Sequence, residues 1–184
     1  MYNKIKIVAI SGSLRNNSSA TYILKHVIKL FPETIDFTLY EGIGMLPHFD
    51  DNENVAPEVT AFRKLLAEAD GVFISQPEYA FGVAGSLKNA LDWTVSSGEL
   101  VDKPVALVTA ATGGDKAHAA LLLTLKALSS KAGERATLLI PFVRTKLNDT
   151  GEVINDEIVK SLTSVVNALV QTIMAQRDEK SMQA

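Results

Sequence analysis

The chain has 184 residues, of which 47% are hydrophobic and 21% are charged, and its formal net charge is −3. This is the composition of a globular protein that can bury a sizeable core in one domain, and it gives no basic surface for a nucleic-acid partner. The chain has no cysteine, which excludes disulfides, cysteine-ligated zinc, iron–sulfur clusters and thiol nucleophiles.

The apolar runs of the chain are short. The first, at residues 4–10, has the length of a strand and no small-residue cleavage site follows it, so we expect no signal peptide. No run approaches the ~20 apolar residues that span a bilayer. We therefore expect a cytoplasmic protein without a membrane partner.

Apolar, β-branched runs alternate with amphipathic patterns five times along the chain. The expected strands are residues 4–10, 35–40, 72–74, 105–109 and 136–140. The expected helices run from Tyr22 through Leu30, over 58–68, from Ser86 through Leu87, Ala90, Leu91 and Val95, over 117–132 with Gly133 as the stop, and from Ile158 through Ile173.

This alternation is typical of a parallel sheet with helices on both faces. Five strands suit a flavodoxin-like three-layer fold with the strand order 2-1-3-4-5. We expect a single domain over residues 1–176, followed by a polar tail at 177–184 that frays.

Three loops with unusual chemistry follow the first, third and fourth strands, and in this strand order they meet at one end of the sheet. The first, residues 11–19, holds one glycine, four serines, Arg15 and two asparagines just before a helix. Free N–H groups and the helix dipole attract an anion there, and Arg15 can pair with phosphate oxygens. The loop matches neither Walker A nor Gly-x-Gly-x-x-Gly, so a single phosphate monoester fits best. The alternative is an ordinary capped helix start with an exposed arginine.

The second and third loops suit a flat ring. Residues 77–82 present Tyr79, Phe81 and several backbone amides, and residues 112–114 bring glycines that allow a close approach. Each loop alone could be a simple turn, with the aromatic residues filling gaps. Together with a phosphate site, they describe a mononucleotide with a large planar base, for which FMN is the leading candidate.

The remaining polar residues carry weaker signals. The histidines, His26, His48 and His118, are scattered and form no expected metal site. The acidic residues Asp50, Asp51 and Glu53 belong to a loop at 41–57 that we expect to be solvated.

Two motifs resemble the NADPH-dependent FMN reductase family, which includes bacterial chromate and quinone reductases and FMN-dependent azoreductases. They are Gly-Ser-Leu-Arg at 12–15 with Ser18, and Pro-Glu-Tyr at 77–79 followed by Leu-Lys-Asn-Ala-Leu-Asp-Trp at 87–93. The resemblance covers nearly the whole chain, including Thr-Gly-Glu-Val-Ile at 150–154. It implies an FMN-binding, flavodoxin-like oxidoreductase that forms homodimers or homotetramers, with the flavin near a subunit boundary.

The loops and the resemblance together give a set of candidate cofactor-binding residues. They are Ser11, Ser13, Arg15, Ser18 and Ser19 in the first loop, Pro77, Glu78, Tyr79, Ala80, Phe81 and Gly82 in the second, and Thr112, Gly113 and Gly114 in the third. The chain departs from the family where Ser19-Ala20 replaces Phe-Asn and where Ala80 replaces Asn. A lost amide contact at these positions is expected to weaken FMN binding or to alter the choice of acceptor.

The expected activity is hydride transfer from NADPH or NADH to bound FMN, followed by reduction of a quinone, an azo compound, a metal oxyanion or free flavin. No side chain is expected to act as a catalyst, because the flavin carries the chemistry and the amides of residues 79–82 and 112–114 stabilise its reduced ring. One alternative is a flavodoxin-type electron carrier that does not oxidise NAD(P)H, although such carriers tend to be strongly acidic. Another is a nucleotide-binding or interaction module without flavin.

Overall fold

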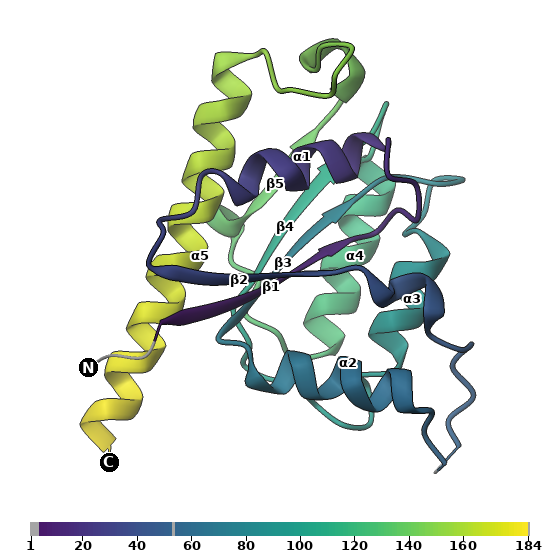
Figure 1. Cartoon of the computed structure of the whole chain (residues 1–184), viewed down its shortest axis with the longest axis vertical. Helices are drawn as coiled ribbons and strands as arrows, with labels where there is room; N and C mark the ends of the chain where they lie inside the picture. The colour runs from purple at the N-terminus through teal and green to yellow at the C-terminus, as the bar shows by residue number, and fades with distance from the viewer. Residues whose placement is uncertain (1–3, 53, 184) are drawn as a thin grey trace.

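The computed structural model describes residues 4–52 and 54–183. Its centre is a parallel five-stranded sheet in the order β2-β1-β3-β4-β5, which confirms the expected fold (Figure 1). The strands are β1 (Ile5–Ser11), β2 (Ile35–Tyr40), β3 (Gly71–Gln76), β4 (Val105–Ala110) and β5 (Thr137–Ile140). The helices are α1 (Ser19–Ile28), α2 (Pro57–Glu68), α3 (Gly85–Asp92), α4 (Asp115–Ala127) and α5 (Asp156–Gln183), with 3₁₀ turns η1 (Gly42–Met45), η2 (Glu134–Ala136) and η3 (Val143–Lys146).

The sheet separates two hydrophobic cores. Alternate residues of a strand point to opposite faces, so Val72 and Ile74 of β3 join the core under α2, α3 and α4, whereas Phe73 joins the core under α1 and α5. All six residues of β3 and of β4 are buried, because helices cover both faces of the sheet. The continuous apolar runs in the sequence reflect this double coverage.

The start of α3 differs from the expectation. The helix begins at Gly85 after Ala84, so Ser86 lies inside the first turn and does not cap it. Leu87, Ala90 and Leu91 are buried as expected. Val95 is exposed because the helix ends at Asp92 and the chain then turns away from the core.

The end of α4 also differs. The helix stops at Ala127, well before Gly133, because Ser129 takes a left-handed backbone conformation with a φ of 55°. The chain then turns back so that the N–H of Lys131 bonds to the carbonyl of Lys103. Gly133 has a φ of −72° and is not the left-handed cap that we expected.

The expected polar tail is part of α5, which continues through Gln183 instead of fraying. Arg177 holds this end of the helix on the domain: its Nη2 lies 2.7 Å from Asp70 Oδ2 and bonds to the carbonyl of Lys4 at 3.0 Å. Within the described residues, Asp156–Met182 is the one helix long and apolar enough to cross a membrane by length and composition alone. Leu162, Val165, Val166, Leu169 and Ile173 of this helix are buried in the core, and core helices of soluble proteins pass the same test.

Polar side chains buried at the carboxyl ends of the strands fix the position of the loops. Ser75 Oγ donates to the carbonyl of Ala20 at 2.8 Å, and Gln76 Nε2 donates to Thr109 Oγ1 at 3.1 Å and to the carbonyl of Ala117 at 3.0 Å. These bonds tie the end of β3 to α1, β4 and α4. The loops after β1, β3 and β4 therefore start from a rigid base.

Candidate functional site

A network of hydroxyl groups shapes the loop between β1 and α1. Ser18 caps α1 by accepting the N–H of Thr21 at 3.1 Å, as in an ordinary helix start. Thr21 Oγ1 is the centre of the network: it lies 2.8 Å from Ser18 Oγ and 3.0 Å from Ser11 Oγ, and it donates to the carbonyl of Arg15 at 3.1 Å. Sequence reasoning missed Thr21, whose position in the first turn of a helix gave no signal.

The first loop is joined to the second by side chains. Ser13 Oγ and Tyr79 Oη lie 3.2 Å apart, and Ser13 Oγ also accepts the N–H of Arg15 at 3.2 Å. Ser13 is buried, so its hydroxyl is used within the protein. The guanidinium of Arg15 is exposed and makes no hydrogen bond or ion pair with the residues that the structure describes.

The second loop is a tight, strained turn. Tyr79 and Gly82 exchange two backbone hydrogen bonds, Tyr79 N–H to Gly82 O at 3.2 Å and Gly82 N–H to Tyr79 O at 2.9 Å. The two residues between them, Ala80 and Phe81, have φ values of 48° and 60°. This left-handed region disfavours side chains, and Phe81 is also 78% exposed. Strain of this kind is concentrated at functional sites.

The second loop is joined to the third through Glu78. Its Oε2 accepts the N–H of Gly114 at 2.9 Å and its Oε1 accepts the N–H of Ala117 at 3.4 Å, so the carboxylate lies at the N-terminus of α4. Gly114 has a φ of 98°, and a Cβ there would lie 2.7 Å from Leu139. Both the backbone conformation and the packing therefore require glycine.

A cavity of about 150 Å³ opens between the three loops. The predicted residues that line it are Arg15, Ser18, Ser19, Pro77, Glu78, Tyr79 and Thr112. Ser11 and Ser13 line a separate hollow of about 290 Å³. Ala80, Phe81, Gly82, Gly113 and Gly114 belong to the same loops but do not line the cavity. Four lining residues were not predicted: Ala110, Ala111, Val143 and Arg144, of which only Arg144, in η3, is charged.

The structure narrows the set of backbone amides that a ligand can use. Tyr79, Gly82 and Gly114 donate their N–H groups within the protein. Within residues 4–52 and 54–183, the N–H groups of Ala80, Phe81, Thr112 and Gly113 have no acceptor. At the start of α1, Thr21 and Tyr22 donate to Ser18, whereas Ser19 and Ala20 are left without an acceptor in this part of the chain. The cavity and its rim thus retain free donors on all three loops.

His118 lies next to this site on α4. Its Nδ1 is 2.8 Å from Thr109 Oγ1, which already accepts a hydrogen bond from Gln76. The hydroxyl of Thr109 still has its proton to donate to Nδ1, which suits a neutral imidazole with its proton on Nε2. Desolvation by burial lowers the pKa of His118 from its ordinary value of 6.5, which agrees with this assignment.

The structure describes His26, His48, Asp50 and Asp51 among the other histidines and acidic residues that the sequence singled out. His48, Asp50 and Asp51 are exposed, and Glu53 lies outside the described residues. Burial and the nearby Lys29 lower the pKa of His26. The described part of the chain holds no group of three or more His, Asp or Glu residues that could bind a metal ion.

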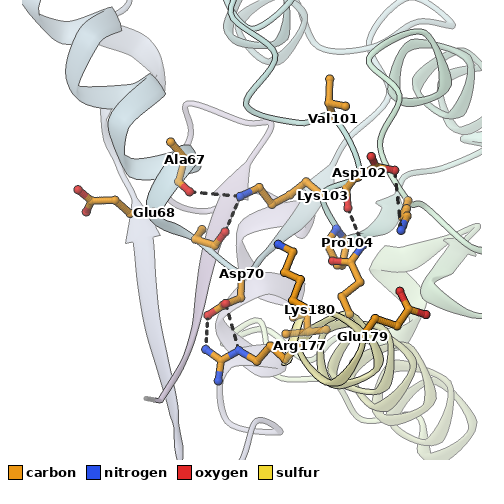
Figure 2. A pocket seen from close by; sticks show the side chains of 14 residues that line it. Ala67, Glu68, Asp70, Val101, Asp102, Lys103, Pro104, Arg177, Glu179 and Lys180 are labelled. Atoms are coloured by element: carbon orange, nitrogen blue, oxygen red, sulfur yellow. Dashed lines mark hydrogen bonds and ion pairs between the residues drawn. The ribbon is translucent and has the colours of Figure 1, made fainter. Parts of the chain in front are cut away.

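A hollow of about 410 Å³ lies at the opposite end of the sheet (Figure 2). Several of its charged groups are bonded within the protein. Lys103 Nζ donates to the carbonyl of Ala69, the residue that follows α2, and Arg177 pairs with Asp70. We attribute this network to the attachment of α2 and α5 to the sheet.

Comparison with known proteins decides the family. A family model described as NADPH-dependent FMN reductase matches residues 5–143, which include all three loops. The chain belongs to this family. The resemblance based on residues 12–15, 77–79 and 87–93 is thereby confirmed, as is the expectation of an FMN- and NAD(P)H-dependent oxidoreductase.

Individual members of the NADPH-dependent FMN reductase family are similar to this chain over different lengths. The chain is 38% identical over 117 residues to an NADPH:quinone oxidoreductase of Arabidopsis thaliana, covering 60% of this chain and 59% of that protein. It is 28% identical over 183 residues to a quinone reductase of Escherichia coli (strain K12), covering 94% and 97%. Among solved structures, the flavoenzyme NAD(P)H:(acceptor) oxidoreductase FerB of Paracoccus denitrificans superposes with a TM-score of 0.82 at 25% identity, covering 93% and 98%.

Proposed function

We propose that the cavity between the three loops binds the phosphate end of FMN and that the bound flavin accepts a hydride from NADPH or NADH. The observation that carries this proposal is the free guanidinium of Arg15 beside the unpaired N–H groups of Ser19 and Ala20, in a chain of the FMN reductase family. A cation and a helix N-terminus form an anion site. This donor set therefore suits a phosphate monoester.

The individual roles follow from the contacts. Arg15 and the start of α1 bind the phosphate, whereas Ser11, Ser13 and Ser18 hold the loop in shape through Thr21. Pro77 and Tyr79 form the wall beside the ribityl chain. Glu78 acts on FMN indirectly, because its carboxylate is bound to Gly114 and Ala117.

The isoalloxazine ring extends beyond the cavity in this proposal. A volume of about 150 Å³ is below the ~300–1,000 Å³ of a typical ligand site, so the structure encloses only part of an FMN molecule. The rest faces the rim, where Phe81 is 78% exposed and Tyr79 is 46% exposed. The free amides of Ala80, Phe81, Thr112 and Gly113 are available there to bond to the ring edge.

This open rim supports a homodimer or homotetramer in which a second subunit covers the ring. Leu14, Phe81 and Phe142 are large, apolar and more than half exposed, and they belong to the loops around the cavity. Exposed apolar patches of this kind are typical of interfaces. Analytical ultracentrifugation tests the proposal, and a monomeric protein that binds FMN would contradict it.

When bound, FMN supplies the hydride chemistry by alternating between its oxidised and reduced forms. The chain positions it and places N–H donors where negative charge develops. We propose a quinone as the second substrate, because quinone reductases recur among the relatives and the exposed aromatic rings of Tyr79 and Phe81 offer a surface for a flat acceptor. NAD(P)H is an intracellular reductant, which supports a cytoplasmic location.

An anaerobic titration of the FMN-reconstituted protein with NADPH and NADH, followed by flavin absorbance, tests the proposed activity. We expect the oxidised flavin band to bleach within the time of one turnover and to return when a quinone is added. Flavin that binds but stays oxidised with both nucleotides would indicate an electron carrier. A protein that cannot bind FMN would refute the flavin site.

A further inference from the structure

Arg144 lies in the wall of the cavity that also contains Arg15, although the two residues are far apart in the sequence. Arg15 follows β1, and Arg144 lies in η3, directly after β5. Like Arg15, Arg144 is exposed, and its guanidinium makes no hydrogen bond or ion pair with residues 4–52 or 54–183. Two cations thus share a cavity of about 150 Å³.

The backbone holds Arg144 at this position. Phe142 turns the chain with a φ of 50°, and its N–H bonds to the carbonyl of Thr112 at 3.0 Å. The next N–H, of Val143, bonds to the carbonyl of Ala111 at 3.1 Å, and the Val143 side chain is buried. Thr145 Oγ1 donates to the carbonyl of Phe142 at 2.9 Å and closes the turn. Arg144 therefore stands on a segment that is fixed to the third loop.

The charges of the cavity are unbalanced. Its lining contains one acidic residue, Glu78, whose two carboxylate oxygens accept N–H groups of Gly114 and Ala117. Neither arginine is neutralised by it in an ion pair. Guanidinium groups repel one another when confined together, and they form paired hydrogen bonds with phosphate oxygens. A group with about two negative charges, as a phosphate monoester has, would balance both arginines.

We propose that Arg144 and Arg15 together clamp the phosphate monoester of FMN, so that the second guanidinium comes from the segment after β5. This inference rests on the proposed function, because it names a further residue of the same site. A phosphate held from both sides also couples FMN to the third loop, since η3 is bonded to Thr112 and Ala111. The clamp therefore contributes to the order of the loop that borders the ring.

The affinities of the apoprotein for FMN and for riboflavin, measured by quenching of flavin fluorescence, test the clamp. Riboflavin has the same ring and ribityl chain but no phosphate. Arg144→Gln is expected to weaken FMN binding by about 10- to 100-fold, the loss of one charge-assisted hydrogen bond, and to leave riboflavin affinity unchanged. Arg144→Lys keeps the charge but not the paired donors. Its FMN affinity is therefore expected to lie between those of the unmodified protein and of Arg144→Gln.

Arg135→Gln is the matched control, because Arg135 is an exposed arginine in η2 that does not line the cavity. Its FMN affinity is expected to equal that of the unmodified protein. The combined variant, Arg15→Gln with Arg144→Gln, is expected to lose more FMN affinity than either single variant, and the N–H groups at the start of α1 are expected to keep the remaining preference for FMN over riboflavin.

Two results would overturn the clamp and leave the proposed function intact. One is an Arg144→Gln protein with the FMN affinity of the unmodified chain, including the case in which only the KM for NADPH rises. The other is an equal loss for FMN and riboflavin, which would show damage to the site in general. If the unmodified protein failed to bind FMN, the proposed function itself would be wrong.

Discussion

The carboxylate of Glu78 accepts the backbone N–H of Gly114 at 2.9 Å, and this bond joins the loop after β3 to the loop after β4. Both loops border the cavity and provide the free amides at its rim. Gly114 is buried, so removing the carboxylate takes the acceptor from a buried N–H group. The Glu78 carboxylate therefore holds the two loops together from within the protein.

Replacing Glu78 by alanine is expected to lower the free energy of unfolding by about 1–3 kcal/mol, the cost of an unsatisfied buried donor. Glu78→Gln keeps an acceptor oxygen and is expected to lose less. Urea denaturation measures both. Asp115→Asn is the control, because it removes an acid from the same helix end without removing a bond to Gly114, and about 0.5 kcal/mol is expected from the helix dipole. Equal losses for Glu78→Ala and Asp115→Asn would contradict the bridging role.

The strain in the second loop predicts a stabilising substitution. Ala80 has a φ of 48°, and glycine adopts this conformation without a steric penalty. Ala80→Gly is therefore expected to raise the free energy of unfolding by up to about 1 kcal/mol, and Ala80→Asn by somewhat less. Thermal unfolding of the apoprotein shows whether each substitution stabilises or destabilises the protein.

An alanine-to-glycine substitution in a helix should have the opposite effect on the free energy of unfolding. Ala119 is exposed in the interior of α4, where glycine costs about 1 kcal/mol relative to alanine. Ala119→Gly should thus destabilise the protein while Ala80→Gly stabilises it. Destabilisation by both would show that the turn is not strained at Ala80.

Periodicity predicted the layers of the fold but not the ends of all the helices. The strands β3 and β4 are apolar throughout because two layers of helices cover them, and a continuous apolar run is the direct trace of that burial. The end of α4 could not be predicted, because Ser129 turns the chain in a conformation that serine rarely adopts. An expectation based on glycine placed the stop at Gly133 instead.

The residues that line the cavity were predictable where the pattern is local, and they were missed where their position depends on tertiary contacts. Serines, glycine and Arg15 before a helix indicate an anion site from neighbouring residues alone. Arg144 reaches the same cavity only because Phe142 turns the chain after β5 and bonds to Thr112. The role of Glu78 depends on the approach of two loops that are 36 residues apart in sequence. Neither contact can be predicted from the residues that are neighbours in the sequence.

The neutral His118 predicts a pH dependence of stability. Burial lowers its pKa in the folded state, so the unfolded chain takes up the proton first as the pH falls. The free energy of unfolding is therefore expected to decrease as the pH falls below about 6.5, and the loss is complete once the pH is below the pKa of the folded state. His26, whose pKa is also lowered, acts in the same direction.

Urea denaturation of His118→Asn between pH 7.5 and 5, a range of about 2.5 pH units around the ordinary histidine pKa, measures this contribution. Asparagine can accept the hydroxyl of Thr109 but does not titrate, so the decrease with falling pH should be smaller than in the unmodified protein. His48→Asn, at an exposed position, is the matched control for the loss of one histidine. An unchanged pH dependence in His118→Asn would argue against a neutral, buried imidazole.

The pair formed by Arg177 and Asp70 predicts that the end of α5 belongs to the folded domain. Arg177 Nε and Nη2 donate to the two carboxylate oxygens at 3.2 and 2.7 Å, and Asp70 also accepts the N–H of Lys6 at 2.7 Å. Arg177→Met is expected to lower the free energy of unfolding by about 1–3 kcal/mol, because a partly buried carboxylate loses its charged partner. Lys180→Met removes an exposed charge from the same helix and is expected to stay within about 0.5 kcal/mol. Removal of residues 178–184 leaves the pair in place and should cost less than Arg177→Met; a larger loss would show that the last turns of α5 carry stability of their own.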